Sequence, residues 1–543
     1  MNGGFCLWVL LAVSQAGAAP GVRFDHQHGL FPEVFDLKLK ANPPGSAIRY
    51  TTDGSEPSAT NGLLYSTPLH IAHTTVLRAI SDSDPGESPT IETRSFIFPT
   101  QVPSQTGQGF PQSWGLNDNK PVPASYTLHR SASPNSDETV AKALQALPSI
   151  SIALPVAELF GPASGIYSHS QETGDTWERA ASVEFLPTDA TKGFRIDAGV
   201  RVQGGWSRRP EESPKHSLRL VFHKRYGGRL KYPLFGPETE TFSTLILRGG
   251  NNNTWLHPES VERRRADYLR DAWMRQTYGA MGRPTARDQY VHVYLNGLYW
   301  GLYDLAERPD AHFISARLGG SEKDYDTRNA DKILTGDDLE WKRLFAAANA
   351  GVTNSTQLAT VAGMLNLEAF ADYMILNLYG ANADIDRGSN WYAARRRNPA
   401  QPMLFLMWDG ERTLEGIDDD RLAQDDDECP TRLFQKLREN PEFRRIFAER
   451  AKLHLTGKGA LSPEVAAARY KALADALETA IPAEAARWGA YRHYIHAFRS
   501  GPYEDYTREE HWRPSVQREL TEYFPQRTDT VIKQFREAKL LGE

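Results

Sequence analysis

The 543-residue sequence predicts a multidomain α+β protein. Three observations support this prediction. Residues 22–98 alternate short β-rich runs with turn dipeptides and show no helical pattern. Residues 141–428 combine strand patterns that end in glycine pairs with amphipathic helix patterns, and residues 429–543 contain helix patterns throughout. At about 150 residues per domain, the length suggests roughly two to four domains.

Residues 1–19 have the pattern of a secretory signal peptide. Residues 5–13 form an apolar run, and Ala16-Gly17-Ala18 fits a small-residue cleavage site. No Lys or Arg precedes the run, so a buried first helix is the alternative. No later stretch reaches the roughly 18 apolar residues of a membrane span. We therefore expect a mature protein that is secreted, periplasmic or at the cell surface, and not transmembrane.

The composition excludes several classes of function. The net charge of -6 and the pI near 6.2 give no general attraction to nucleic acid. Cys6 lies in the predicted signal and Cys429 is the only other cysteine, which excludes an intramolecular disulfide and a cysteine-based zinc site in the mature chain. No Walker A, H-E-x-x-H, G-x-S-x-G or H-R-D-L-x-x-x-N motif occurs, so the usual P-loop, zincin, hydrolase and protein-kinase signatures are missing.

Residues 22–98 predict a small β-sandwich. The stretch AIRYTTDGSEPSATNGLLYST alternates β-rich runs with Asp53-Gly54 and Asn61-Gly62, two dipeptides typical of hairpin turns. The motif IRYTTDGSEP resembles the small module at the C-termini of chitobiases and other exported bacterial enzymes. We interpret its DGSEP segment as a structural turn. Residues 99–140 are rich in Pro, Ser, Gly, Gln and Asn without periodicity, and we interpret them as a linker.

Residues 141–428 contain the clearest element signals. Strands are predicted at SISIALP, GFRIDAGVRVQGG, SLRLVFH and TFSTLILRGG, and YVHVYLNGLYWGLYDLAE predicts a hairpin that turns at Asn296-Gly297. One helix is predicted from about residue 263 to 278. Another is predicted from 367 to 379, between Asn366 as N-cap and Gly380 as the stop. Residues 429–543 predict a helical C-terminal extension.

A glycine-rich turn is a candidate phosphate-binding element. In RVQGGWSRRPEESPKHSLRL a strand ends at Gly204-Gly205, a polar turn with Ser207 and Arg208 follows, and the chain returns through Lys215. Glycines let backbone N–H groups approach phosphate oxygens, and a strand-borne lysine neutralises them. Glu307, where an apolar strand stops at an acid, is a candidate to hold that lysine. A plain hairpin and a solvated strand end are the alternatives.

The stretches NADIDRGSNWY and PMLFLMWDGE together predict a metal–nucleotide site. Magnesium usually takes one or two carboxylates plus substrate phosphates, and an Asp can accept the proton of an acceptor hydroxyl. Asp384 or Asp386 with Asn390, followed by Asp409 at a strand end, supplies these groups. The order of Asp, Asn, strand and Asp-Gly is similar to that of protein kinases. Two turns and a helix cap are the alternative.

Five stretches together resemble the spore-coat CotH kinase family, an atypical and distant branch of the protein-kinase-like fold. In the family's order, between about residues 145 and 420, they are GVRVQGGWSRRPEESPKHSLRL, DYLRDAW, VHVYLNGLYWGLYDLAERPD, NADIDRGSNWYAARR and FLMWDGERTLEG. The resemblance implies an atypical protein-kinase-like α+β domain that transfers phosphate from ATP to Ser or Thr of a protein, with Mg²⁺ or Mn²⁺. It also implies an exported bacterial protein with a β-sandwich module beside the kinase-like domain.

The resemblance implies a role for each candidate residue. Lys215 would contact the nucleotide phosphates, and Glu307 would pair with it. Asp384 or Asp386 would act at the catalytic centre. The other candidates form two groups, the nucleotide-binding Gly204, Gly205, Ser207 and Arg208 and the metal-binding Asn390, Asp409 and Glu411.

Two departures from the family pattern concern this site. Kinases space the catalytic Asp and the metal-binding Asn as D-x-x-x-x-N, whereas Asp386 is one residue too close to Asn390 and Asp384 one too far. Family members commonly show W-D-x-D where this chain has WDGE, so Glu411 stands at a substituted position.

Two other functions are compatible with the sequence. The first is a non-catalytic envelope or surface protein whose β-module binds carbohydrate or protein, for which 12 Trp and 22 Tyr offer stacking groups. The second is another enzyme class such as a glycoside hydrolase, since carboxylates are abundant. For the kinase, ATP is scarce outside cells, so the acceptor is modified before export or the donor is not ATP. Transfer of AMP in place of phosphate is a variant of the same hypothesis. The expected partners are a nucleotide, a protein acceptor and a cell-envelope glycan.

Overall fold

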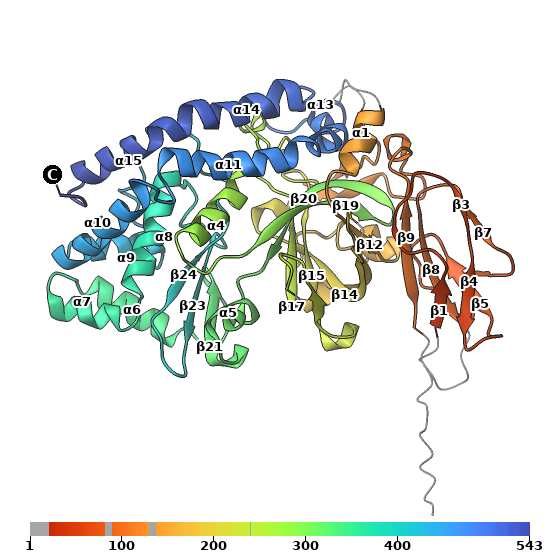
Figure 1. Cartoon of the computed structure of the whole chain (residues 1–543), viewed down its shortest axis with the longest axis horizontal. Helices are drawn as coiled ribbons and strands as arrows, with labels where there is room; N and C mark the ends of the chain where they lie inside the picture. The colour runs from red at the N-terminus through yellow and green to blue at the C-terminus, as the bar shows by residue number, and fades with distance from the viewer. Residues whose placement is uncertain (1–20, 82–89, 130–136, 190, 239, 543) are drawn as a thin grey trace, which may run out of the picture.

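The structure is a computed structural model that describes residues 21–542 apart from 82–89, 130–136, 190 and 239. The predicted signal peptide, residues 1–19, lies outside the described residues. Three parts follow one another across Figure 1, namely an N-terminal β-module, a β-barrel and a helix-rich C-terminal half that contains a second sheet. This is the multidomain α+β architecture that the sequence predicts.

The N-terminal module is built of short strands, as predicted. Its largest sheet has the order β2-β9-β8-β5-β6, and β1 pairs with β4 while β3 pairs with β7. Leu37, Leu77 and Phe96 are fully buried between these sheets. The strands are β1 (Gly21–Phe24), β2 (Gly29–Leu30), β3 (Phe35–Leu37), β4 (Leu39–Asn42), β5 (Ile48–Thr51), β6 (Leu63–Leu64), β7 (Leu69–Ile71), β8 (Thr75–Ser81) and β9 (Glu92–Ile97).

A closed barrel forms the centre of the molecule, with the strand order β12-β13-β14-β15-β18-β20-β19. Neighbouring strands are antiparallel, and the parallel pair of β12 and β19 closes the barrel. Asn296 and Gly297 both have positive φ, as a two-residue hairpin turn requires, so the predicted hairpin is confirmed. The strands are β12 (Ser149–Ala153), β13 (Arg179–Leu186), β14 (Phe194–Gln203), β15 (Ser217–Val221), β18 (Thr244–Arg248), β19 (Asp288–Leu295) and β20 (Leu298–Glu307).

Residues 99–140 were expected to be a linker, but their described part, residues 99–129, packs against the barrel. It contains a 3-10 turn at Val102–Ser104 and the hairpin of β10 (Ser113–Asn117) and β11 (Lys120–Pro123). The Trp114 side chain is fully buried, with its ring centroid 5.3 Å from that of Trp300. The polar composition of this segment therefore gave no indication of the few apolar side chains, such as Trp114, that pack into the barrel core.

The C-terminal half surrounds a sheet of order β22-β21-β23-β24. The predicted helix 367–379 is confirmed as α8 (Leu367–Gly380), where Asn366 caps the N-terminus by accepting from the Ala369 N–H at 2.9 Å. The predicted helix 263–278 is wrong as one element, because Tyr268 adopts φ 67° and separates α3 (Ser260–Arg264) from α4 (Arg270–Ala280). The strands are β21 (Tyr325–Asn329), β22 (Lys332–Thr335), β23 (Trp391–Arg396) and β24 (Leu404–Met407).

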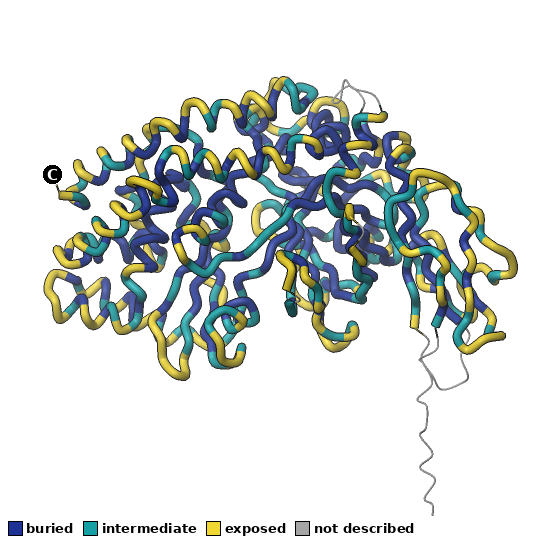
Figure 2. The backbone as a smooth tube through the Cα atoms, in the orientation of Figure 1, coloured by how far each residue is buried: buried dark blue, intermediate teal, exposed yellow. Residues whose placement is uncertain are grey.

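The predicted helical extension is helical and packs into the rest of the molecule. In Figure 1 the long helices α11 and α15 run side by side across the top, over α4 and α8. Figure 2 shows their buried faces turned toward the interior, continuous with the buried barrel. The helices here are α9 (Pro430–Leu437), α10 (Pro441–Leu455), α11 (Pro463–Glu478), α12 (Ile481–Glu484), α13 (Tyr491–Tyr494), α14 (Arg513–Arg518) and α15 (Phe524–Glu537).

Smaller elements complete the described chain. They are α1 (Asp137–Leu144), α2 (Val156–Phe160), β16 (Leu230–Tyr232), β17 (Glu240–Phe242), α5 (Ala311–Leu318), α6 (Leu339–Asn349) and α7 (Ser355–Ala362). Within the part of the chain that the structure describes, no helix has the length and apolar character needed to cross a membrane.

Candidate functional site

A cleft of about 660 Å³ lies between the outer face of the barrel and the loops around β23 and β24. Four stretches far apart in the sequence contribute to it: the turn after β14, the end of β18, the loop before β23 and the loop after β24. The predicted site residues that line it are Gly204, Gly205, Ser207, Asn390, Asp384, Asp409 and Glu411. The fold therefore brings most of the predicted nucleotide, metal and catalytic groups together.

The glycine turn forms one wall of the cleft. Gly204 has φ 125°, and a Cβ there would collide with the Ser207 hydroxyl, so glycine is needed at this position. Arg208 was predicted to bind nucleotide, but its side chain supports the turn instead. Its Nε donates to the Gly204 carbonyl at 2.8 Å, and its Nη1 donates to the carbonyls of Ser170 and Glu172 at 2.9 and 2.8 Å. These bonds direct the guanidinium away from the cleft.

The predicted pair of Lys215 and Glu307 is wrong. The Lys215 side chain is fully buried inside the barrel, where its Nζ lies 2.6 Å from Glu484 Oε1 on α12. Glu307 instead bonds Arg287, with Nη2 2.9 Å from Oε1, and also Arg317. The sequence does not show which side of the sheet a lysine just ahead of a strand will occupy, and here it is the interior.

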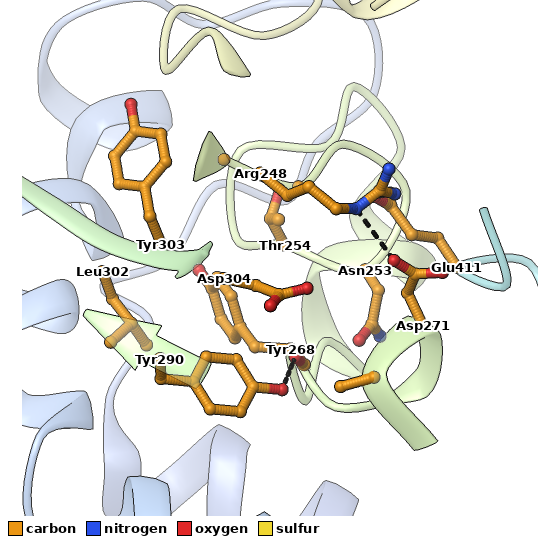
Figure 3. A pocket seen from close by; sticks show the side chains of 13 residues that line it. Arg248, Asn253, Thr254, Tyr268, Asp271, Tyr290, Leu302, Tyr303, Asp304 and Glu411 are labelled. Carbon is orange, nitrogen blue, oxygen red and sulfur yellow. Dashed lines mark hydrogen bonds and ion pairs between the residues drawn. The ribbon is translucent and has the colours of Figure 1, made fainter. Parts of the chain in front are cut away.

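Arg248, which the sequence did not indicate, is the arginine of the cleft that pairs with its acidic residues Asp409 and Glu411. It ends β18, and its Nε lies 2.8 Å from Asp271 Oδ2 on α4, as Figure 3 shows. Its Nη2 lies 2.9 Å from Asp409 Oδ1 and 3.0 Å from Glu411 Oε1. Burial lowers the pKa of Arg248, but the charges of these three carboxylates outweigh burial and hold the pKa well above its usual value. Two sequence signals could have indicated this pair. One is a strand that ends in Arg-Gly-Gly, and the other is an Asp in DYLRDAW.

The acidic side of the cleft is held by backbone amides. Glu411 Oε2 accepts from the N–H groups of Asn251 and Asn252 at 2.9 and 2.7 Å, and Asp271 Oδ1 accepts from the Gly410 N–H at 2.8 Å. Asp409 follows β24 with φ 61°. Burial raises the pKa of Asp409 to about 7, and the nearby charges of Glu411 and Asp271 add to the rise.

The two acids of the 384–386 loop point in different directions. Asp384 lines the cleft, and its backbone carbonyl accepts from Asn390 Nδ2 at 3.0 Å. Asp386 Oδ2 accepts from the Thr431 hydroxyl at 2.6 Å, at the start of α9. Burial raises the pKa of Asp386 to about 6. The structure thus places Asp384, and not Asp386, where a substrate in the cleft would meet it.

The donor set of the cleft fits a divalent cation that also contacts phosphate. Among the described residues, no group of three His, Cys, Asp or Glu side chains is arranged to hold a metal. Mg²⁺ usually keeps one or two carboxylates and completes its shell with phosphates and water. Asp409 and Glu411 already share one cation, the Arg248 guanidinium, and Asn390 lines the same cleft. These three residues could hold the metal.

A small pocket of about 40 Å³ is lined by Arg248 together with Asp271, Asp304 and Asn253 (Figure 3). Asp304 and Asn253 line it, and the Oδ1 atom of each is buried with no hydrogen-bond partner among the described residues. Arg275 forms ion pairs with both Asp304 and Asp271. The network of charged side chains therefore extends from the cleft into the protein interior. The cavity has room for ordered water, which would satisfy these oxygens.

Comparison with known families covers both parts of the chain. A family model described as CotH kinase protein matches residues 200–531, which is more than half of the chain and includes the cleft and most of the C-terminal helices. A second model, described as Fn3 associated, matches residues 37–96 of the β-module. No curated protein matches the chain. The chain therefore belongs to the CotH kinase family and has an Fn3-associated module ahead of its kinase domain.

Proposed function

We propose that this chain is a protein kinase that transfers the terminal phosphate of a nucleoside triphosphate to a Ser or Thr hydroxyl of a protein. The resemblance implies ATP as the donor and Mg²⁺ or Mn²⁺ as the metal. The observation that supports the proposal most strongly is the convergence of the Gly204-Gly205 turn, Asp384, Asn390, Asp409 and Glu411 on one cleft with Arg248 at its centre.

Each group has a definite task in phosphoryl transfer. The backbone N–H groups of the glycine turn bind phosphate oxygens, since no side chain at Gly204 or Gly205 obstructs their approach. Asp384 accepts the proton of the acceptor hydroxyl and orients that oxygen toward the phosphorus. Asp409, Asn390 and Glu411 would hold the metal, which when bound would supply positive charge for the phosphate oxygens.

Arg248 connects the phosphate and metal functions. Its Nη2 now bonds both Asp409 and Glu411, while its Nε bonds Asp271. Asp271 would keep the Arg248 guanidinium in place beside a bound phosphate, to which Arg248 would donate. In kinases a lysine and a glutamate perform this task; we propose that Arg248 and Asp271 perform it here.

We further propose that the protein acts after export, on an acceptor in the cell envelope or outside the cell. The signal-like N-terminus supports this placement. The Fn3-associated module would then contact an envelope glycan or protein and hold the kinase domain near its acceptor.

The test is transfer of labelled phosphate to candidate exported proteins by wild type, Asp384→Asn and Asp386→Asn. Loss of a general base typically costs 10²- to 10⁴-fold, so we expect Asp384→Asn to lose at least about 100-fold in rate. Asp386→Asn is the matched control and should stay within a few-fold of wild type. Full activity in Asp384→Asn would remove this loop from the mechanism.

A further inference from the structure

A second pocket, of about 600 Å³, lies beside α5 and is separate from the cleft. Its walls are β17 with the start of β18, the loop before β19, the loop after β20 and one face of α5. Among the described residues, the two linings have no member in common. Thr244 lines this pocket and Arg248 lines the cleft, and these ends of β18 are about 13 Å apart along the strand. None of the roles proposed above uses this pocket.

The lining of the second pocket is rich in arginine, and we call it the arginine pocket. Its four arginines are Arg283, Arg287, Arg308 and Arg317. Three carboxylates line it as well, so the lining has one positive charge in excess when histidine is counted as neutral. The whole chain, by contrast, has a net charge of -6. The excess charge indicates that the pocket attracts an anion.

The acids of the arginine pocket already have partners within it. Glu307 Oε1 lies 2.9 Å from Arg287 Nη2, and Glu307 also pairs with Arg317. Glu240 Oε1 accepts from Arg287 Nη1 at 2.9 Å. Asp310 caps the N-terminus of α5. Two arginines of the pocket are therefore satisfied by its own acids, and two are left.

The remaining arginines, Arg283 and Arg308, have guanidinium nitrogens without acceptors. Arg308 forms no hydrogen bond or ion pair with any residue that the structure describes, and its buried Nε has no partner. Arg283 bonds Asp372 through its Nε at 2.6 Å, and that carboxylate is shared with Arg450. Buried donors normally find acceptors. These nitrogens therefore mark the place where the oxygens of a ligand would bind.

The two arginines come from adjacent loops. The Glu307 N–H donates to the Arg287 carbonyl at 3.0 Å, so the chain entering β19 runs beside the chain leaving β20. Arg283 lies four residues before Arg287, and Arg308 directly follows Glu307. Ala316, an exposed residue of α5, lines the same pocket and adds no charge. The pocket volume lies within the range of about 300–1,000 Å³ that is typical of ligand sites.

We propose that the arginine pocket binds a phosphorylated serine or threonine side chain of a protein. The planar guanidinium of arginine matches phosphate, because it donates two parallel bonds to phosphate oxygens. A phosphate monoester has nearly two negative charges and three acceptor oxygens, so it uses donors from two arginines at once. The transfer proposed above produces such a group. That source of the ligand rests on the proposed function, whereas the binding itself needs no catalysis.

Peptide binding to the full chain tests the proposal. Fluorescence anisotropy would follow a labelled pentapeptide with phosphoserine at its centre, and matched peptides with serine or glutamate at that position. We expect the phosphoserine peptide to bind about ten-fold or more tightly than either. An excess of ATP with Mg²⁺ should leave it bound, because the cleft is a separate site. Equal binding of the three peptides, or displacement by ATP, would overturn the inference.

Two variants test the lining. Arg308→Met removes the unpaired guanidinium, and Ala316→Glu adds a negative charge at an exposed position of the wall. Each should weaken binding of the phosphoserine peptide by about ten-fold. Arg343→Met and Ala346→Glu make the same changes at exposed positions of α6 and should match wild type. Wild-type affinity in either folded pocket variant would contradict the proposed site.

Two further measurements separate the alternatives. Inorganic phosphate should displace the peptide only at a concentration at least about ten-fold above that of the unlabelled phosphopeptide, because it lacks the contacts of the peptide chain. Displacement at equal concentrations would assign the pocket to free phosphate and overturn the protein ligand. Arg308→Met should still bind ATP as wild type does, so a failure of the peptide experiments leaves the proposed function standing.

Discussion

At the residue scale, two acids two positions apart have different surroundings because a tight turn separates them. Neither spacing to Asn390 matched the kinase pattern, so the sequence left Asp384 and Asp386 open. In the structure Asp384 lines the cleft, and Asp386 bonds Thr431 on the other side of the loop. Thr431, at a helix N-terminus 45 residues downstream of Asp386, binds Asp386 and so distinguishes it from Asp384. No local sequence pattern predicts this contact.

Asp386→Asn should stabilise the protein at neutral pH. The pKa of Asp386 is raised to about 6 by burial, from 3.8, so the native state binds this proton more tightly than the unfolded state does. The contribution of this proton to the free energy of unfolding is fully present below about pH 4. It is lost as the pH rises through about 6. Asn keeps an acceptor for Thr431 without the charge, so its advantage should appear above pH 4 and level off above pH 6.

Urea unfolding of both proteins at pH 4, 5, 6 and 7 measures this difference. Asp384→Asn is the control, because Asp384 lines the open cleft. A wild-type protein that remains more stable than Asp386→Asn at pH 7 would contradict the assigned environment of Asp386.

The same scale shows why Lys215 was predicted to bind phosphate in the cleft and Arg248 was not. Lys215 follows a glycine turn, where a phosphate-binding lysine is expected, yet its side chain enters the barrel and meets Glu484. Arg248 was not predicted because its partners come from two other stretches, Asp271 from one and Asp409 with Glu411 from the other. The glycines and acids of the cleft could be predicted, because residues at strand ends follow local rules. Which basic side chain pairs with those acids depends on tertiary contacts, so it could not be predicted.

At the element scale, strong periodicity predicted position and type well. The hairpin at Asn296-Gly297 and the helix α8 are confirmed, because turn dipeptides and caps are local signals. The failures have tertiary causes. Asp267 accepts from the Leu269 N–H at 2.8 Å and pairs with Arg270 at 2.9 Å, which holds the break that ends the expected single helix.

The buried pair of Lys215 and Glu484 joins the short helix α12 to the barrel. Lys215→Met should cost about 3–5 kcal/mol in the free energy of unfolding, because it leaves Glu484 as a buried unpaired charge. Lys215→Met/Glu484→Gln should be less destabilised than Lys215→Met alone, since Gln still accepts from the Leu302 N–H that Glu484 Oε2 now bonds at 2.7 Å.

Denaturant unfolding of the wild type, both single variants and the double variant gives the coupling energy between the two positions. The folded double variant should also bind nucleotide as wild type does. Loss of nucleotide binding by a stably folded double variant would contradict the placement of Lys215 outside the site.

At the scale of the whole molecule, the β-module is attached to the barrel through a buried polar contact. Glu184 of β13 is fully buried and accepts from the Ser95 N–H at 3.2 Å and from the Ser95 hydroxyl. His28 Nδ1 lies 2.7 Å from Glu184 Oε1, and Ser95 Oγ lies 2.7 Å from Ser151 Oγ. The module therefore has a fixed position beside the kinase domain, which composition alone did not predict.

Glu184→Ala should loosen the module from the barrel. It leaves the Ser95 N–H without its acceptor, at a cost of about 1–3 kcal/mol. In scanning calorimetry we expect the module of the variant to melt at a lower temperature than the barrel, while Glu33→Ala, at an exposed position of the module, should melt as wild type does. Identical calorimetric profiles for Glu184→Ala and wild type would show that this contact does not hold the two parts together.

The central claim is that the cleft around Arg248 and Asp409 binds a metal and a nucleoside triphosphate. The most direct measurement is the shift in melting temperature with ATP or GTP, with and without Mg²⁺, for wild type and Asp409→Asn. Ligand at 100 times its Kd should stabilise wild type by about 2.7 kcal/mol, and Mg²⁺ should increase the shift. The folded Asp409→Asn protein should show no increase with Mg²⁺. No shift of wild type with either nucleotide, or the same Mg²⁺ increase in both proteins, would contradict the claim.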